Sequence, residues 1–175
     1  LPPVEPPLPP APAPPLDEMT CDVPRLGAAM SSAYSAAYGA SAVIDGDLST
    51  ICASLFGANE WVSIRVPEGS LIGYVAVYNR LDKPGDQIWL SPFEVLVGDH
   101  YGDTSSTAHR CATMEVPTGP GPYMIGCGGT TLGSYVTLRQ VGPARYLTIS
   151  ELKVCSILPP PSPASPPLPP LPPLP

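Results

Sequence analysis

The sequence is poor in positive charge and in long apolar runs. Only 8 of its 175 residues are Lys or Arg, against 15 Asp or Glu, so the formal net charge is −7. No basic run is present, which argues against binding to nucleic acid or to an anionic membrane surface. No stretch reaches the ~18 consecutive apolar residues of a transmembrane helix, so no membrane span is expected. The start at Leu1 carries no signal-peptide pattern, which is typical of a mature product or a fragment.

Patterns of a zinc site or of a catalytic centre are also lacking. The five cysteines show no CxxC spacing, and the two histidines, His100 and His109, lie in a polar stretch. Neither a nucleophile elbow nor a phosphate-binding glycine loop is present. We therefore expect no enzyme, and we expect disulfides formed in an oxidising compartment.

Proline is abundant, but it is concentrated at the two ends. Residues 1–16 hold nine prolines and residues 159–175 hold eleven, which is 20 of the 28 in the chain. Proline lacks a backbone donor and has a fixed φ, so these ends are predicted to be extended polyproline II arms. The predicted organisation is an N-terminal arm at 1–20, a globular domain at 21–157 and a C-terminal arm at 158–175.

The C-terminal arm has a repeat that matters for assembly. With three residues per turn, polyproline II would align Leu168, Leu171 and Leu174 along one edge. Such an apolar edge favours packing on another surface, either a neighbouring subunit or a second arm. A plain spacer is the alternative.

Between the arms, short runs of alternating or apolar residues predict β-strands. Turn signals separate these runs, among them Pro67-Glu68-Gly69 and Lys83-Pro84-Gly85. The segment 27–42 is rich in Ala and Ser but lacks a helical apolar stripe, so we expect irregular strand and loop there. Strands of this length and spacing predict an all-β sandwich or barrel. The predicted strands are 61–66, 71–78, 93–98, 113–116, 123–125, 135–141 and 146–154.

Seven segments, taken in order, resemble the discoidin and F-type lectin superfamily of galactose-binding-like domains. They include AVIDGD at 42–47, NEWVSI at 59–64 and VAVYNR at 75–80, and they end with YLTISELKV at 146–154. The resemblance covers about residues 21–156 and implies a jelly-roll β-sandwich between the two arms.

The resemblance also implies a structural calcium site at the turn Asp45-Gly46-Asp47. Carried over, the side chains of Asp45 and Glu151 and the main-chain carbonyls of Ala42 and Asp47 would ligate the ion. Oxygen ligands of this kind suit Ca²⁺. The alternative is that the two aspartates only hydrogen-bond the backbone of their own turn.

A carbohydrate site is the second implication, and here the sequence departs from the family. Fucose-binding members use a His and two Arg around an NRxD-type segment, which Arg80 and Asp82 match in part. No matching His is present, and Asp86-Gln87-Ile88 stands where a second Arg is expected. Because little is then left to orient a sugar, the preferred interpretation of Arg80 is an ion pair with Asp82 or Glu94.

The cysteines allow two pairings. Cys111 and Cys127 bracket a hairpin-like segment, and Cys21 and Cys155 stand where the arms meet the centre. A Cys21–Cys155 bond would close a long loop, worth ~4–5 kcal/mol in the chain-entropy model, and would leave Cys52 unpaired. In related lectins a cysteine near Cys52 bridges to the last strand, so a rival pairing of Cys52 with Cys155 stays open.

Two functions follow from these features. The preferred one is an extracellular structural glycoprotein module that self-assembles head to tail into fibrils through its arms, in a wall, matrix or cell-surface fibre. The arms resemble those of hydroxyproline-rich algal and plant proteins, which implies covalent O-glycans. The implied hydroxylation and glycosylation positions are Pro12, Pro14, Pro161, Ser162, Pro163, Ser165, Pro166 and Pro167. The alternative is a calcium-dependent carbohydrate-binding lectin module on proline-rich stalks.

Docking of an arm would need an aromatic groove, because a preformed polyproline helix binds aromatic-lined grooves at a low entropic cost. The candidate groove residues are Tyr34, Tyr38, Tyr74, Tyr78 and Trp89.

Overall fold

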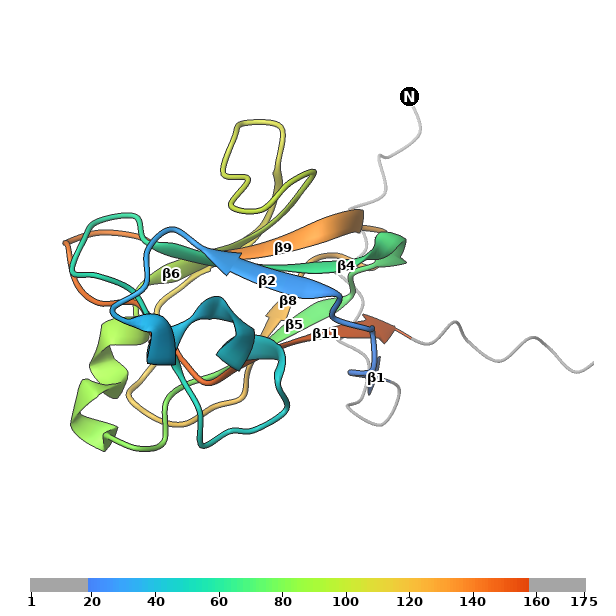
Figure 1. The fold of residues 1–175 in the computed structure, drawn as a ribbon. Coiled ribbons are helices and arrows are strands. Elements are labelled where there is room, and N and C mark those ends of the chain that lie inside the picture. Colours follow the sequence, from blue (N-terminus) through green and yellow to red (C-terminus); the bar gives the residue numbers. More distant parts are fainter. Residues whose placement is uncertain (1–18, 158–175) are drawn as a thin grey trace, which may run out of the picture.

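Two antiparallel β-sheets packed face to face make up the domain (Figure 1). The computed structural model describes residues 19–157. The predicted arms, with their hydroxylation and glycosylation positions, lie outside these residues except for Met19 and Thr20.

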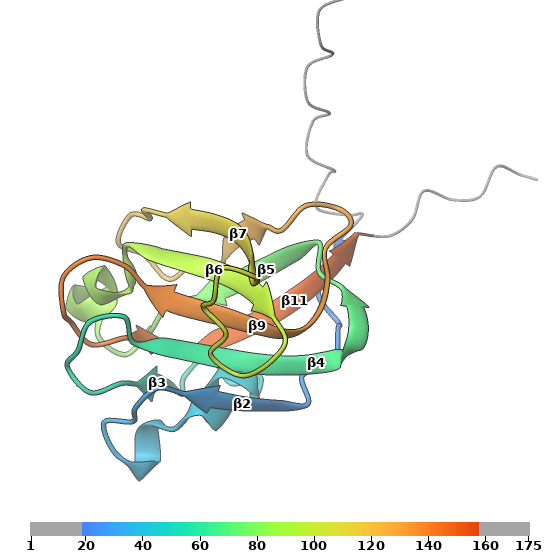
Figure 2. The same cartoon turned by 90° about the horizontal axis from the view of Figure 1, so that it is seen from above.

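The larger sheet has five strands, and the view in Figure 2 looks onto it. Its order across the sheet is β2 (Gly27–Met30), β4 (Trp61–Leu71), β9 (Leu132–Gln140), β6 (Phe93–Gly98) and β7 (His109–Met114). The smaller sheet has four strands, in the order β1 (Met19–Thr20), β11 (Glu151–Ile157), β5 (Tyr74–Tyr78) and β8 (Tyr123–Gly126). A separate short pair consists of β3 (Cys52–Ala53) and β10 (Thr148–Ile149).

The core lies between the two sheets and is built from alternating side chains. On β6, Phe93, Val95 and Val97 are buried, and on the neighbouring β9 Val136 and Leu138 are buried as well. Side chains of this kind from two facing sheets interdigitate in a sandwich core. The predicted all-β jelly-roll sandwich is confirmed.

One prediction about a turn is wrong. Pro67-Glu68-Gly69 was expected to separate two strands, but β4 continues through it to Leu71. The pairing of β4 with β9 shifts register between Arg65 and Ser70, and Gly69 has a φ of 72°. The extra residues are therefore absorbed as a bulge, for which glycine supplies the positive φ.

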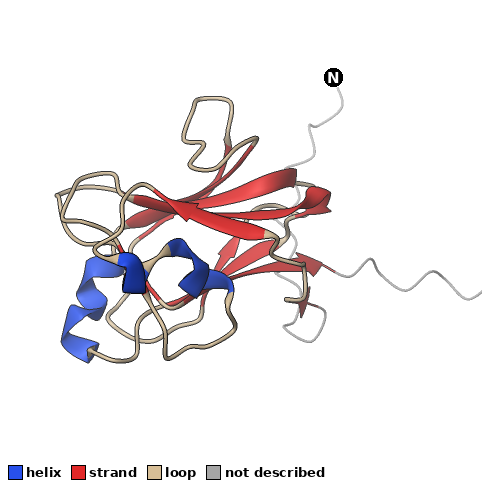
Figure 3. Ribbon diagram, viewed as in Figure 1, coloured by secondary structure: helices blue, strands red, loops and turns tan. Residues whose placement is uncertain are grey.

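Residues 19–157 contain three short 3₁₀ helices that were not expected from the sequence. They are η2 (Ala36–Tyr38), η3 (Ala40–Ile44) and η4 (Pro84–Leu90), and they gather at one end of the sandwich (Figure 3). Proline at the first position of η4 suits a helix start, because its missing N–H would be unsatisfied there anyway. The segment 27–42 is thus a strand followed by 3₁₀ turns rather than irregular strand and loop throughout.

The described ends of the chain lie at the other end of the sandwich (Figure 1). Glu151 pairs with Tyr78 and Cys155 pairs with Tyr74, so β11 runs from the helical end to the far end. At ~3.3 Å per residue, its length separates the helical end from the chain ends by roughly 20 Å.

Two disulfides are present, Cys21–Cys155 and Cys111–Cys127, while Cys52 is free and buried. These are the pairs expected from the positions of the cysteines at the arm junctions and around the hairpin. Burial raises the pKa of the Cys52 thiol to about 12, so this thiol stays protonated at neutral pH.

Candidate functional site

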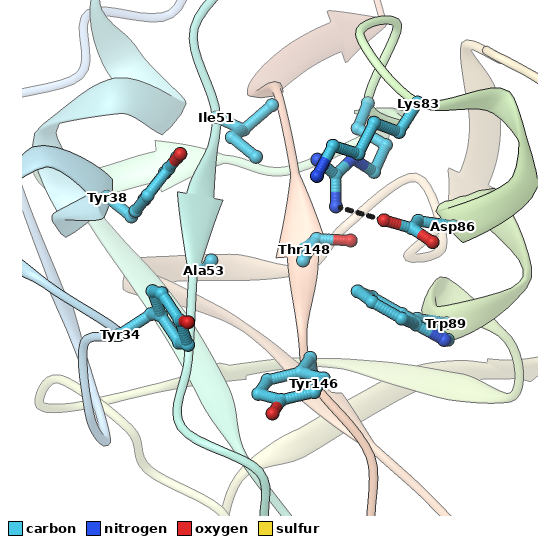
Figure 4. Close-up of a pocket in the computed structure, with 10 residues that line it drawn as sticks. Tyr34, Tyr38, Ile51, Ala53, Lys83, Asp86, Trp89, Tyr146 and Thr148 are labelled. Carbon is cyan, nitrogen blue, oxygen red and sulfur yellow. Dashed lines mark hydrogen bonds and ion pairs between the residues drawn. The ribbon is translucent and has the colours of Figure 1, made fainter.

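The helical end of the sandwich carries a pocket of about 250 Å³ (Figure 4). Four segments supply its lining: the residues between β2 and η3, those around β3, the region from the end of β5 through η4, and the residues leading into β10. We call it the aromatic pocket; it is lined by Tyr34, Tyr38, Ile51, Ala53, Arg80, Lys83, Asp86, Trp89, Tyr146 and Thr148.

Aromatic rings form one continuous wall of the pocket. The ring centroid of Tyr146 lies 5.1 Å from that of Trp89 and 6.0 Å from that of Tyr34. Tyr38 continues the row at 6.0 Å from Tyr34, and Phe56 contacts the outer side of Tyr146 at 5.5 Å. Such spacing is that of favourable edge-to-face and tilted ring pairs, so the rings support one another.

Backbone hydrogen bonds hold these segments together. The N–H of Tyr34 donates to the carbonyl of Ala53 at 2.7 Å, and the N–H of Leu147 donates to the hydroxyl of Ser54 at 2.8 Å. Tyr34 and Tyr146 are therefore placed by the edges of the short β3–β10 pair.

Arg145 holds the backbone of Trp89 in place through hydrogen bonds. Its guanidinium donates to the carbonyl of Trp89 at 2.8 Å, to that of Val141 at 3.0 Å, and to that of Pro92. Burial without a facing carboxylate lowers the pKa of Arg145. The side chain thus ties the end of η4 to the loop that carries Tyr146.

The polar side of the pocket is organised by Arg80, which is 5 % exposed. Its Nε and Nη2 donate to the two carboxylate oxygens of Asp82 at 2.8 and 2.6 Å, and its Nη1 donates to Asp86 at 3.3 Å. The Cζ atom of Arg80 also lies 5.9 Å from the ring centroid of Trp89. The predicted ion pair with Asp82 is present, whereas Glu94 pairs with Arg110 and Arg139 instead.

The Arg80–Asp82 pair is formed at neutral pH. Its hydrogen bonds hold the pKa of Asp82 below its usual value of 3.8 and raise the pKa of Arg80. Because the folded-state pKa of Asp82 is lowered, the pair is complete above pH 3.8 and is lost as the pH falls through the lowered pKa.

Several polar groups at the pocket are still available to a ligand. A guanidinium has five N–H donors and Arg80 uses three, so two remain within the described part of the chain. The hydroxyl of Thr148 is buried and has no hydrogen-bond partner among residues 19–157. Figure 4 shows Thr148 at the centre of the pocket, with Tyr38 and Ala53 on one side and Asp86 and Trp89 on the other. A buried polar group without a partner is costly, so a ligand hydroxyl at this point would be stabilising.

The formal charges around the pocket cancel. Arg80 and Lys83 carry two positive charges, and Asp82 and Asp86 carry two negative ones. The Lys83 ammonium has no hydrogen bond or ion pair in the described range. The arrangement thus offers donors and acceptors without favouring a charged ligand.

A second pocket, of about 450 Å³, shares no lining residue with the aromatic pocket. Its lining is mostly polar, with Arg65, Glu68 and Asp99 beside the single aromatic ring of Tyr135. It lacks a wall of aromatic rings, so the aromatic pocket is the better candidate site.

Two of the predicted calcium ligands, Asp45 and Asp47, form hydrogen bonds within their own turn. Asp45 accepts from the N–H of Asp47 at 2.8 Å and from the hydroxyl of Thr50 at 2.8 Å, and Asp47 accepts from Ser49. Residues 19–157 contain no group of three His, Cys, Asp or Glu side chains that could hold a metal ion. The hydrogen bonds of the two aspartates are those that the alternative named for them above expects.

Sequence reasoning found part of the pocket. Of the five aromatic candidates, Tyr34, Tyr38 and Trp89 line it, whereas Tyr74 and Tyr78 lie on β5 outside it. Lys83, Tyr146 and Thr148 were missed as site residues. Lys83 is three residues after Arg80, so its place beside Arg80 could have been predicted from this spacing. Tyr146 and Thr148 lie in a predicted strand, where no local pattern indicates a binding residue.

Comparisons with known structures place this fold. The fucolectin from striped bass (Morone saxatilis) serum has a TM-score of 0.65 and 20% identity over 74% of this chain, and the chain spans 46% of that lectin. The family 32 CBM from C. perfringens NanJ, in complex with galactose, has a TM-score of 0.62 and 14% identity, covering 80% of this chain and 95% of that one. An F5/8 type C domain from Bacteroides fragilis has a TM-score of 0.61 and 17% identity, covering 75% and 91%.

These likenesses show the fold, which is the discoidin-type, galactose-binding-like jelly roll expected from the sequence. No protein-family model and no curated protein sequence matches the chain. Within the described residues, no helix is long and apolar enough to cross a membrane.

Proposed function

We propose that this domain is a carbohydrate-binding module and that the aromatic pocket holds a neutral sugar. The observation that carries the proposal is the unpartnered, buried hydroxyl of Thr148, which lies in the same pocket as the spare donors of Arg80 and the ring of Trp89. A sugar ring has an apolar face of C–H groups and a rim of hydroxyls, so it matches an aromatic wall with polar groups opposite.

Each polar group of the pocket could form a hydrogen bond with a different hydroxyl of a sugar. The two free N–H groups of Arg80 would donate to neighbouring hydroxyl oxygens, and Lys83 would add a third donor. Asp86 uses one carboxylate oxygen for Arg80, which leaves the other to accept a hydroxyl proton. The missing His and second Arg of the fucose-binding pattern would thus be replaced by Lys83, Asp86 and Thr148.

Size favours a terminal sugar unit. The pocket volume of about 250 Å³ is below the ~300–1,000 Å³ typical of pockets for drug-sized ligands. A sugar has about twelve non-hydrogen atoms, and at roughly 0.3–0.5 kcal/mol per atom we expect a Kd of about 0.05–2 mM. Avidity from several linked copies would be needed for tight attachment.

A glycan array tests this proposal. The full chain, presented as a multivalent probe, should bind neutral glycans that end in a galactose- or fucose-class sugar and should ignore glycans whose terminal sugar is charged. Isothermal titration calorimetry with the free sugar should give a Kd in the range above. Binding restricted to anionic glycans, or no binding to any glycan, would contradict the proposal.

Assembly through the proline-rich arms is a second candidate function. Tyr34, Phe56 and Ile88 are 57%, 63% and 62% exposed at the helical end, while the described chain ends lie at the other end. An arm attached at that end would start roughly 20 Å from the aromatic rings of its own domain, so we propose that it meets those of the next copy. No binding to any glycan on the array, together with filaments in electron micrographs, would favour assembly over sugar binding. In both cases we propose an extracellular setting, since two disulfides are typical of oxidising compartments.

A further inference from the structure

Glu151 is a fully buried carboxylate at the start of β11. One of its oxygens, Oε2, accepts a hydrogen bond from the backbone N–H of Gly46 at 3.3 Å. The other, Oε1, forms a salt bridge with the Arg25 guanidinium. A buried charge is tolerated only when it is paired, so the ion pair with Arg25 is what allows a carboxylate to be buried at position 151.

The Nη1 atom of Arg25 lies among oxygens from two elements. Besides Glu151, it donates to the carbonyl of Leu152 on β11 at 3.0 Å and lies 3.5 Å from the carbonyl of Val43 in η3. One carboxylate and two main-chain carbonyls thus surround a single positive charge. Oxygens of these types are the ones that a hard cation would use.

The same region is where the fold resemblance implies calcium, and its residues do not fit that ion. Calcium takes six to eight oxygen ligands from its surroundings. Here the Arg25 guanidinium already occupies the oxygens of Glu151, Leu152 and Val43. Asp45 and Asp47 are exposed and hydrogen-bond their own turn, so they do not complete a shell.

The backbone holds Arg25 in this position from both sides. Cys21, four residues earlier, is tied to Cys155 on β11. Leu26, the next residue, donates its N–H to the carbonyl of Arg65 at 2.7 Å and leads directly into β2. Arg25 therefore reaches Glu151 from a constrained segment, which reduces the entropy lost in forming the ion pair.

We propose that the Arg25 guanidinium takes the place of a structural calcium ion in this domain. Its positive charge joins η3 to β11, because it contacts the carbonyl of Val43 on one side and the oxygens of Glu151 and Leu152 on the other. The fold is then independent of divalent cations. This inference stands whether or not the aromatic pocket binds a sugar.

Thermal unfolding of the full chain tests the inference. The Tm of the wild type should be the same within about 1 °C in excess EDTA and in millimolar CaCl₂. Arg25→Ala should lower the Tm by roughly 10–15 °C, because it leaves a buried carboxylate unpaired.

Arg65→Ala is the matched control, because the Arg65 side chain is exposed and makes no hydrogen bond or ion pair within residues 19–157. Its Tm should stay within about 2 °C of the wild type. If Arg25→Ala does not fold, Arg25→Lys keeps the positive charge and should fold with a measurable Tm below that of the wild type. A wild-type Tm that falls in EDTA and returns with calcium would overturn the proposal, as would an Arg25→Ala variant as stable as Arg65→Ala.

Discussion

Replacing Trp89 with alanine should weaken sugar binding by at least about 30-fold, which would raise the expected Kd to about 1.5–60 mM or above. The ring of Trp89 packs 5.1 Å from Tyr146 and lies 5.9 Å from the guanidinium carbon of Arg80. Its loss would remove the centre of the stacking surface and one support of the main hydrogen-bond donor. Central aromatic residues of binding sites commonly cost 2 kcal/mol or more on truncation. Calorimetric titration of the variant with the sugar found for the wild type provides the measurement.

Ile88→Ala is the control for this experiment. Ile88 precedes Trp89 on the same 3₁₀ helix, is 62% exposed and does not line the aromatic pocket. It should bind the sugar as the wild type does, and both variants should keep the far-ultraviolet circular dichroism spectrum of the parent. Equal affinities for the two variants would show that Trp89 does not contact the ligand.

Removing the Cys21–Cys155 disulfide should have the largest effect on stability. The two cysteines are 134 residues apart in sequence, so their bond constrains nearly the whole domain in the unfolded state. The chain-entropy model gives a loss of about 5 kcal/mol for a loop of this length. Since small domains are stable by about 5–15 kcal/mol, the Cys21→Ala/Cys155→Ala variant should be at or near the limit of folding. Guanidinium chloride unfolding measures the change.

The second disulfide provides the comparison. Cys111 and Cys127 are 16 residues apart, for which the same model gives about 3 kcal/mol. The Cys111→Ala/Cys127→Ala variant should therefore lose roughly 2 kcal/mol less than the first. If the two double variants unfold at the same denaturant concentration, the order expected from loop length does not hold in this domain.

Strand positions could be predicted where apolar residues alternate in the sequence, because alternate positions of a strand face the same side of the sheet. Phe93, Val95 and Val97 are apolar because they face the core, and the predicted strand 93–98 matches β6. The bulge in β4 could not be read this way, because Pro67-Glu68-Gly69 carries the residues of a turn whether the chain reverses or continues. The pairing of Ser70 with Gly133 and of Leu71 with Leu132 shows that it continues.

The site was harder to predict because its residues depend on contacts between distant segments. Thr148 belongs to β10, whose two residues are both buried, and its special role comes from the lack of a partner for its hydroxyl. Arg25 lies 126 residues from Glu151 in sequence, and no local pattern connects them. Arg80 could be found because Asp82, its partner, is two residues away.

Nuclear magnetic resonance offers the most direct measurement of the central claim, that the aromatic pocket binds a neutral sugar. The ¹⁵N-labelled full chain would be titrated with D-galactose and with L-fucose up to about 50 mM. At least one of the two should shift the Trp89 indole N–H, the Arg80 Nε–H and the Thr148 amide, with the changes confined to the pocket. A spectrum unchanged by both sugars, or shifts that cluster away from the pocket, would contradict the account.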